Sequence, residues 1–211
     1  LEALAQFGLV AHPTETGWKV PGSQVGHPAD VTVEGDYSQA SNYLVAASMG
    51  NSLTVTGLST SSAQGDRIIC DYARQLDGTG TVILSVRQCP DLVPALAVRA
   101  ALRAGETTHI VDAARLRLKE SDRLEAVTAE LNKLGAQVEQ TPDALIIHGV
   151  PHLHGGTCDS HGDHRIAMML AVAATCADGV VEVTGAESVA KSYPNFWEDY
   201  EQLGGTIVRT E

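Results

Sequence analysis

The chain has 211 residues, of which 44% are hydrophobic and 19% are charged, a composition typical of a folded protein with a sizeable core. Its net charge of -12 argues against a broad nucleic-acid-binding face, although a small anion site needs only local positive charge. No apolar run approaches the roughly 20 residues of a membrane-spanning helix, and no segment has a signal-peptide pattern. Four scattered cysteines form no CxxC pair and are expected to be reduced thiols. Together these features predict a cytoplasmic protein that binds neither nucleic acid nor membrane.

The first twenty residues carry the end of a helix and a hairpin. LEALAQFG, residues 1–8, has the pattern of an amphipathic helix closed by Gly8. LVAHPTETGWKV, residues 9–20, predicts strand, turn and strand, with the turn near Pro13 to Gly17. Because the chain opens without Met and within a helical pattern, we expect a fragment that continues on its N-terminal side.

Three later segments share one order of elements. Each starts with an Ala-rich apolar helix that ends at a Gly or Asp-Gly and leads to a β-branched strand; they span residues 40–59, 92–114 and 164–187. A second helix follows in each, at about 66–76, 122–134 and 192–203. Further strands follow at 81–86, 136–149 and 205–211. The pattern predicts one supersecondary unit used three times, with the first copy shortened.

The two helices of each unit differ in polarity. The first is apolar nearly all round and is expected to be buried, whereas the second is amphipathic. These patterns predict an α/β domain with helices inside, sheets and polar helix faces outside, and pseudo-threefold symmetry.

Positive charge is concentrated before and within the second helix of the middle unit. RLRLKESDRLEAV, residues 115–127, holds four of the fourteen Lys and Arg residues: Arg115, Arg117, Lys119 and Arg123. DRLE predicts Asp122 as N-cap with Glu125 at N3, which places Arg123 at the first helical position. A cation there costs about 0.3–1 kcal/mol, because the helix dipole is positive at its N-terminus. A local rule broken without evident gain indicates a functional site.

The same feature recurs at other predicted helix starts. In GDHRIAMM, Asp163 is the expected N-cap, so His164 and Arg165 occupy the first turn. In VAKSYPNF, Ser192 is the expected N-cap and Lys191 precedes it.

An acid opens the first helix of the middle unit, where Asp91 stands. If these helix starts converge, their cations form a site for phosphate or carboxylate, with Asp91 and Glu120 placed for proton transfer. Simpler interpretations exist for each residue: Arg123 could pair with neighbouring acids, Arg165 could cap a helix end, Lys191 could be solvated and Asp91 could be an N-cap. Repetition at equivalent places favours the shared site.

Four motifs give the chain a family resemblance. RLRLKESDRLEAVTAELNKLGAQVE, CPDLVPALAV, GDHRIAMMLAVAA and VAKSYPNFWEDYEQLG together resemble the 5-enolpyruvylshikimate-3-phosphate synthase family, and EGDYSQASNYLVAA and SSAQGD fit it as well. The resemblance covers nearly the whole chain but only the later half of the family's length. It implies an enolpyruvyl-transferase-type α/β domain of three βαβαββ units, an inside-out barrel with buried helices and sheets outside. Residues 1–30 would be the terminal hairpin of a preceding N-terminal domain plus linker, and 31–211 the C-terminal domain, with repeats of about 31–90, 91–157 and 158–211.

The resemblance also implies a reaction. The family transfers the enolpyruvyl (carboxyvinyl) group of phosphoenolpyruvate to the 5-hydroxyl of shikimate 3-phosphate, releases phosphate, serves aromatic amino-acid (chorismate) biosynthesis, and requires no metal or organic cofactor. Both substrates bind between two domains, so the partner here would be the missing N-terminal domain. We expect the fragment alone to turn over little or nothing.

Roles follow from the matching positions. Asp91 matches the base facing the 5-hydroxyl, Lys119 a contact to the shikimate phosphate and hydroxyls, and Glu120 the acid near the methylene carbon. The expected phosphoenolpyruvate ligands are Arg123, Arg165 and Lys191, with Lys191 also a catalytic candidate. His164 would brace Arg165, and Arg115 would reach the same anion or point away.

Three alternatives stay open. A related enzyme could transfer enolpyruvyl to UDP-N-acetylglucosamine on the same fold. HGVPHLHGGTCDSHGDH, residues 148–164, packs five His and one Cys into seventeen residues and could form a metal-binding module, although its spacing matches no zinc motif. The domain could also bind anions without catalysis.

Overall fold

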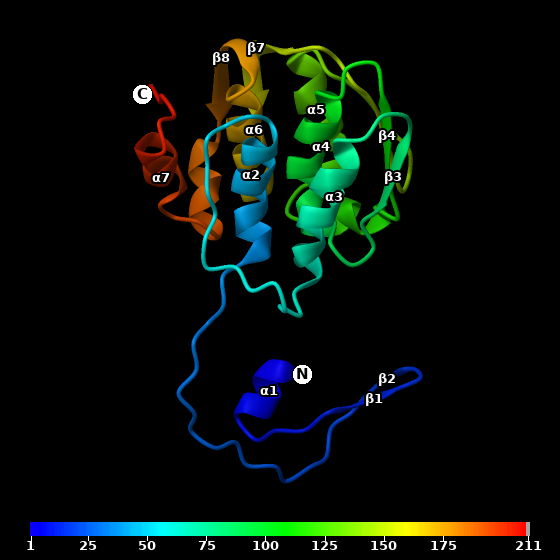
Figure 1. Cartoon of the computed structure of the whole chain (residues 1–211), viewed down its shortest axis with the longest axis vertical. Coiled ribbons are helices and arrows are strands. Elements are labelled where there is room, and N and C mark those ends of the chain that lie inside the picture. The colour runs from blue at the N-terminus through cyan, green and yellow to red at the C-terminus, as the bar shows by residue number, and fades with distance from the viewer. Residues whose placement is uncertain (210–211) are drawn as a thin grey trace.

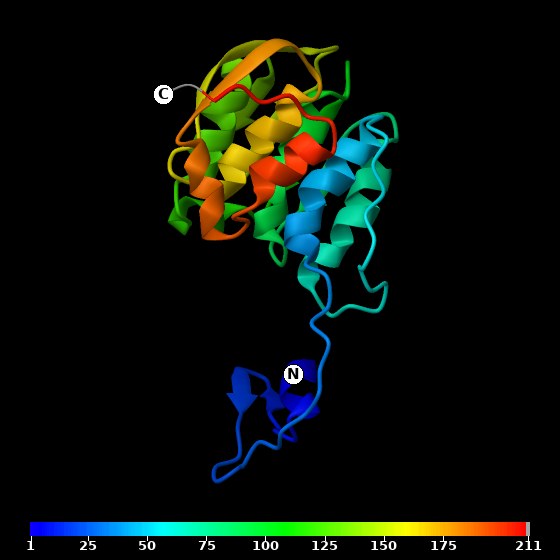
Figure 2. The ribbon, with the colours of Figure 1, turned by 90° about the vertical axis from the view of Figure 1, so that its left-hand side faces the viewer.

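A computed structural model describes residues 1–209, and its N-terminal segment lies apart from the rest (Figure 1). Helix α1 (Glu2–Gln6) is followed by the antiparallel strands β1 (His12–Thr14) and β2 (Gly17–Lys19). The predicted helix end is confirmed, since Gly8 takes φ 73°, and so is the hairpin. An extended segment then leads to the main body (Figure 2). No residue of 1–36 is buried, and Trp18 is 60% exposed.

The main body is built around helices. The α-helices are α2 (Tyr37–Ser48), α3 (Ile69–Leu76), α4 (Val93–Ala101), α5 (Arg123–Lys133), α6 (His164–Ala174) and α7 (Phe196–Gln202). Short 3-10 helices η1 (Gly65–Ile68), η2 (Pro90–Leu92), η3 (Ala114–Leu118) and η4 (Ala186–Lys191) join them. None of the helices within residues 1–209 is both long and apolar enough to cross a membrane.

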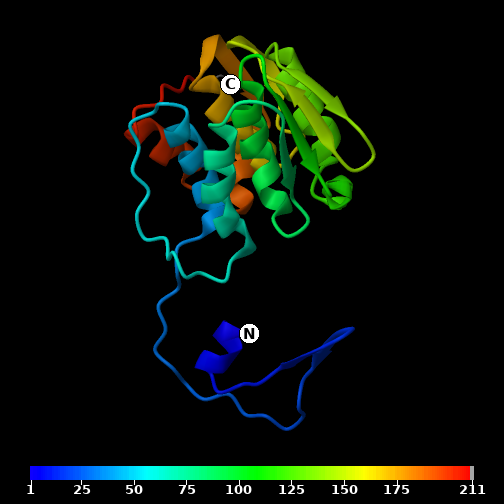
Figure 3. The same ribbon diagram turned by 45° about the vertical axis from the view of Figure 1, so that its right-hand side comes forward.

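Two sheets flank these helices. The larger has the order β3-β4-β6-β5, from β3 (Val82–Ser85), β4 (Thr107–Val111), β5 (Gln137–Gln140) and β6 (Leu145–His148). β3 and β4 are parallel, and the other pairs are antiparallel. The smaller sheet pairs β7 (Leu153–Asp159) with β8 (Ala177–Thr184) in parallel. The larger sheet covers the outer flank, with helices behind it (Figure 3).

The prediction of buried central helices is confirmed. All residues of α4 except Arg99 are buried, and so are all of α6 except Ala174. Their small side chains let the helices approach closely, and both contact α2. The helices therefore form the core and the sheets its outer cover, as the repeat pattern indicates.

Two details of the predicted third unit are wrong. Ser192 is not an N-cap: α7 begins only at Phe196, after Asn195, and Lys191 is instead the last residue of η4. Pro194 explains the shift, because the residue before a proline is disfavoured in helical conformation.

Two predicted strands are also absent from the described residues. Residues 52–57 and 205–209 run without strand pairing, although both segments contain β-branched residues. The rest of the final predicted strand, residues 210–211, lies outside the described part of the chain.

Candidate active site

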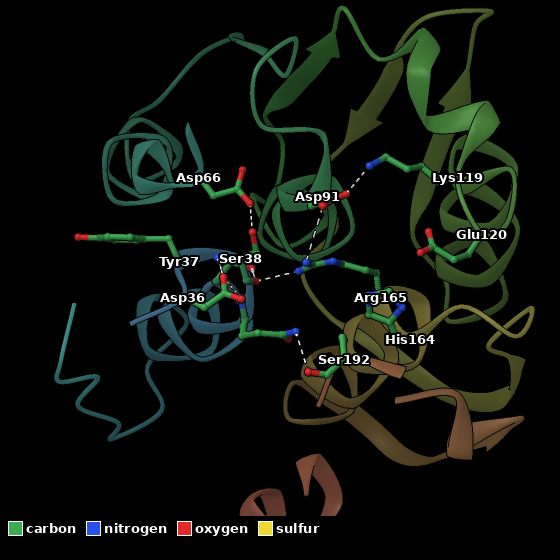
Figure 4. Close-up of polar contacts among 12 residues, drawn as sticks. Asp36, Tyr37, Ser38, Asp66, Asp91, Lys119, Glu120, His164, Arg165 and Ser192 are labelled. Atoms are coloured by element: carbon green, nitrogen blue, oxygen red, sulfur yellow. Dashed lines mark hydrogen bonds and ion pairs between the residues drawn. The ribbon is translucent and has the colours of Figure 1, made fainter. Parts of the chain in front are cut away.

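Four chain segments bring charged side chains together where helices begin (Figure 4). Asp91 comes from η2 before α4, Arg123 from the start of α5, and Arg165 from the start of α6. Lys119 and Glu120 lie in the loop between η3 and α5, and Lys191 reaches the cluster from the end of η4. The predicted convergence is therefore confirmed for the helix starts that carry Asp91, Arg123 and Arg165, whereas Lys191 joins the cluster from the end of η4.

Asp91 lies among three cations. Its Oδ1 lies 2.7 Å from Arg123 Nη1 and 3.0 Å from Lys119 Nζ, and its Oδ2 lies 3.8 Å from Arg165 Nη2. Burial alone would raise the pKa of Asp91, but the hydrogen bond from Lys119 and the neighbouring cations outweigh it and hold the pKa below 3.8. The Asp91 side chain caps no helix, so it is an ionised acceptor facing the cluster.

Arg123 is the buried centre of the cluster, with a side chain only 1% exposed. It donates from Nε and Nη2 to Asp163 at 2.7 and 3.1 Å, from Nη1 to Asp91, and from Nη2 to Glu120 at 2.8 Å. Burial favours its neutral form, yet these carboxylates outweigh burial and raise the pKa of the Arg123 guanidinium above its usual value. The guanidinium is thus held by three carboxylates.

Asp163 joins the starts of α5 and α6. Its carboxylate is fully buried, caps α6 by accepting from the Arg165 amide at 2.9 Å, and accepts from Ser121 Oγ at 3.0 Å. Burial opposes its charge, but the Arg123 bonds outweigh it and keep the pKa below 3.8. The predicted N-cap is confirmed, and Asp163 also carries the main counter-charge for Arg123.

Arg165 is buried but has weaker partners. Its Nη1 donates to the Ser38 carbonyl in α2 at 2.9 Å, and its Nε has no partner among the described residues. Burial lowers the pKa of the Arg165 guanidinium below its usual value, with Asp91 acting in the opposite direction. The guanidinium therefore keeps hydrogen-bonding capacity for a further group.

His164 and Asp66 surround this arginine. Burial and then the Arg165 charge lower the pKa of His164 from 6.5. Within residues 1–209 no hydrogen bond joins the His164 ring to the Arg165 guanidinium, so the bracing role stays a prediction. Ser38 Oγ donates to Asp66, whose pKa is raised from 3.8, first by burial. Arg165 is therefore a buried cation whose ion-pair partner, Asp91 Oδ2, lies 3.8 Å away.

Glu120 and Lys191 form the outer edge. Lys191 Nζ lies 2.5 Å from Glu120 Oε1, and the Lys191 side chain is 56% exposed. The hydrogen bond from Lys191 is the main cause that lowers the pKa of Glu120 from 4.5. This pair is accessible and shares a hydrogen bond that a proton can follow.

Two cations of residues 115–127 lie outside the cluster. Within residues 1–209, Arg115 is exposed and its side chain makes no hydrogen bond or ion pair, so it does not join the predicted anion site. Arg117 pairs with Asp122 at 2.7 Å and donates to the β5–β6 turn, which fixes the loop before α5. Residues 115–127 therefore contain an exposed cation, a cation that fixes a loop, and cations that belong to the cluster.

A family model described as EPSP synthase (3-phosphoshikimate 1-carboxyvinyltransferase) matches residues 1–200. The chain belongs to the EPSP synthase family. Among its relatives are the 3-phosphoshikimate 1-carboxyvinyltransferases of Clostridium kluyveri, 45% identical over 98% of this chain and 52% of the relative, and Clostridium acetobutylicum, 42% identical over 98% and 51%. The chain thus spans about half the length of the curated relatives it matches.

Solved structures confirm the fold of this EPSP synthase family member. EPSP synthase from Acinetobacter baumannii matches with a TM-score of 0.85 and 24% identity, over 99% of this chain and 54% of that one. The enolpyruvyl transferase NikO from Streptomyces tendae matches with a TM-score of 0.68 and 20% identity, over 99% and 53%. The predicted enolpyruvyl-transferase-type α/β architecture is therefore correct.

Three contributors to the site were not identified from the sequence. Asp163 was assigned only as a cap, and Ser38 and Asp66 belong to the EGDYS and SSAQGD segments, to which no role was given. Helix-start patterns locate Asp163, but they do not show that its carboxylate faces the arginine of a different helix. Ser38 and Asp66 have no motif of that kind.

Proposed function

We propose that the chain is the C-terminal half of a 3-phosphoshikimate 1-carboxyvinyltransferase, which transfers the enolpyruvyl group of phosphoenolpyruvate to the 5-hydroxyl of shikimate 3-phosphate and releases phosphate. The observation that carries the proposal is the convergence of Asp91, Lys119, Glu120, Arg165 and Lys191 at helix starts in a member of this family. Both substrates are multiply charged anions, which helix N-termini and Arg and Lys side chains bind well.

The proposed domain division follows from the same family membership. Residues 1–30 would complete an N-terminal domain and its linker, and 31–211 would form the C-terminal domain with repeats of about 31–90, 91–157 and 158–211. The many large apolar side chains that are exposed in the first segment support this, because such exposure is typical of a surface that another domain covers: Leu1, Leu4, Phe7, Val10, Trp18, Val20 and Val25. The partner in this proposal is the N-terminal half of the same enzyme.

The proposed addition step needs one base and one acid. Asp91, held ionised, accepts the proton of the 5-hydroxyl of shikimate 3-phosphate while the hydroxyl oxygen bonds to C2 of phosphoenolpyruvate. A second proton is added to the C3 methylene carbon of phosphoenolpyruvate. In the elimination step the C2–O bond to phosphate breaks and C3 returns a proton, which restores the double bond. The named side chains supply acid, base and anion contacts, so the proposal invokes no metal or organic cofactor.

We divide the acid role between two residues. Glu120 has a pKa below 4.5 and is ionised at pH 7, so it has no proton to give. Lys191, at 2.5 Å from Glu120, holds the proton that the methylene carbon needs. We therefore propose that the Lys191–Glu120 pair delivers the proton to C3 in the addition step. The Glu120 carboxylate then accepts the proton that C3 loses in the elimination step.

One arginine and two lysines retain free donors, and we assign them to the two substrates. Arg165 and Lys191 would hold the phosphoenolpyruvate anions, and Lys119 the shikimate 3-phosphate. Arg123 stays assigned to the phosphoenolpyruvate site, but it acts there indirectly, by orienting Asp91 and Glu120. Since its four hydrogen bonds go to carboxylates, it acts as a positioning residue.

We also place the protein in the cytoplasm, where its four free cysteines would stay reduced. Fractionation of the source cells would test this.

The test is titration of the purified chain with phosphoenolpyruvate and shikimate 3-phosphate, followed by calorimetry and NMR shifts. We expect weak, saturable phosphoenolpyruvate binding that Arg165→Ala and Lys191→Met each reduce, and no phosphate release by the chain alone. Addition of the N-terminal half of a relative should restore phosphate release. Arg115→Ala, which removes an exposed charge outside the cluster, is the matched control.

The outcomes separate the open alternatives. Binding without any turnover after the second half is added would favour an anion-binding module. Transfer to UDP-N-acetylglucosamine and none to shikimate 3-phosphate would favour the related sugar enzyme. Turnover by the chain alone would overturn the half-site proposal.

A further inference from the structure

The histidine-rich stretch 148–164 separates into different environments. His148 Nδ1 lies 3.2 Å from Thr107 Oγ1, His161 Nε2 lies 2.8 Å from Glu130 Oε1, and His164 belongs to the candidate active site. Cys158 is buried, with its Sγ 3.8 Å from the Glu130 carbonyl oxygen. Each of these groups is already engaged.

The remaining two histidines share one face at the start of β7. His152 and His154 are exposed, whereas Leu153 between them is fully buried, so the alternation of a strand puts both imidazoles on the outer side. Their ring centroids are 4.9 Å apart. Within residues 1–209, neither ring makes a hydrogen bond.

A carboxylate from the neighbouring strand completes the group. Asp178 in β8 is the register partner of His154, and such partners project from the same face. One ligand atom from each of His152, His154 and Asp178 lies within 4.8 Å of the others. The spacing of residues in the stretch 148–164 could not reveal this, because the third group lies 24 positions beyond His154 in the chain.

The backbone around His154 fixes where its ring can lie. The His154 amide donates to the Leu134 carbonyl at 2.8 Å, and a register shift follows between His154 and Gly156. The ring packs on Gly135, where a Cβ would come within 2.7 Å of Cδ2. Gly135 has φ 87°, which favours glycine, so the end of α5 leaves room for the imidazole.

We propose that His152, His154 and Asp178 bind one Zn²⁺ on the outer face of the β7–β8 sheet. Two imidazoles and a carboxylate are ligands that zinc accepts, and water would take the remaining position. Ligand atoms around one zinc are separated by at most about 4.2 Å, since each bond is about 2.1 Å, so the exposed side chains need to move by roughly 1 Å. The ion ties the start of β7 to the start of β8.

The position indicates a structural effect. The site lies where β7 and β8 begin, whereas the candidate active site lies after β7 ends, at the start of α6. Zinc would therefore stabilise the β7–α6–β8 unit without contacting the cluster around Asp91.

The test is equilibrium dialysis of ZnCl2 against the tag-free chain, with thermal melts in the absence and presence of zinc. We expect one zinc per chain and a zinc-dependent rise in Tm. His154→Ala and the isosteric Asp178→Asn should each weaken binding at least tenfold and abolish the rise in Tm. His148→Ala, which removes a histidine of the same stretch, should leave both unchanged.

Melts without zinc check that the variants fold, so loss of binding is separable from loss of structure. Equal zinc binding by parent and His154→Ala would overturn the proposal. Cobalt substitution gives a second readout: a thiolate-to-cobalt charge-transfer band would place a cysteine among the ligands and also overturn it.

Discussion

The starts of α5 and α6 have similar sequences but hold their arginines differently. Each helix has an aspartate N-cap followed within two residues by an arginine, Arg123 in α5 and Arg165 in α6. Arg123 is bound by three carboxylates, whereas Arg165 has one carbonyl partner, a carboxylate at 3.8 Å and, among residues 1–209, no partner for its Nε. The same local pattern therefore gives one arginine that organises the site and one that is available to an anion.

The difference arises from the neighbouring helix start. Asp163 caps α6 and at the same time pairs with Arg123 of α5. It has no comparable side-chain bond to the Arg165 guanidinium within residues 1–209. A cap that belongs to one helix can thus supply the counter-charge of another, which a sequence pattern does not express.

The largest expected effect is on stability, from Arg123→Ala. The change leaves Asp163, which is 0% exposed, without its principal cation, and Asp91 without one of its three cations. Breaking a buried pair by removing one partner costs about 3–5 kcal/mol. Urea unfolding would measure it, with Arg115→Ala expected to stay within about 0.5 kcal/mol of the parent. A cost of less than about 1 kcal/mol would show that Arg123 is not the organising residue.

The second effect, from Arg165→Ala, is expected on ligand affinity rather than on stability. Because burial of this guanidinium is poorly compensated, Arg165→Ala should change the free energy of unfolding by no more than about 1 kcal/mol. Phosphoenolpyruvate affinity should fall at least tenfold, about 1.4 kcal/mol. Calorimetry on the parent, Arg165→Ala and Arg115→Ala would separate the two quantities. Unchanged affinity would remove the distinction between the two arginines.

The sequence predicts more of the fold than of the site's internal contacts. Buried helices α4 and α6 follow from their nearly unbroken apolar runs, and the Asp122 and Asp163 caps follow from residue type. Residues 52–57 have a strand composition but no strand to pair with, because pairing depends on which edge lies nearby. Composition alone does not settle that.

The same limit applies to the charged residues. Arg115, Arg117, Lys119 and Arg123 are near neighbours in sequence, yet one is solvated, one fixes a loop and two join the cluster. Residue type and helix position predict that cations gather here. Which cation pairs with which acid depends on Asp91, from the start of the same repeat, and on Asp163, from the next one.

A third effect concerns the turn before α6. Glu130, 1% exposed, accepts from Lys133, from the Asp159 amide at 2.9 Å and from His161, and so fixes the turn that delivers Asp163. Burial would raise its pKa, but these bonds outweigh it and hold the pKa below 4.5. Its contribution to stability is therefore present above pH 4.5 and lost as the pH falls through the lower folded value.

Glu130→Gln keeps the shape but removes the charge, so it should cost about 1–2 kcal/mol at pH 7. Denaturation at a series of pH values should show the gap to the parent closing in acid. A gap that is independent of pH would mean that the carboxylate charge does not hold the turn.

The smallest effect has the opposite sign and comes from Asp66, near Arg165. Burial is the main cause that raises its folded pKa above 3.8, so ionised Asp66 costs stability as the pH rises through that folded value. Asp66→Asn removes the cost and still accepts from Ser38, so the stability of this variant at pH 7 should match or exceed that of the parent. The difference should vanish below pH 3.8. Loss of stability at pH 7 would instead make Asp66 a counterion of Arg165, and the starts of α5 and α6 would then differ less than their contacts indicate.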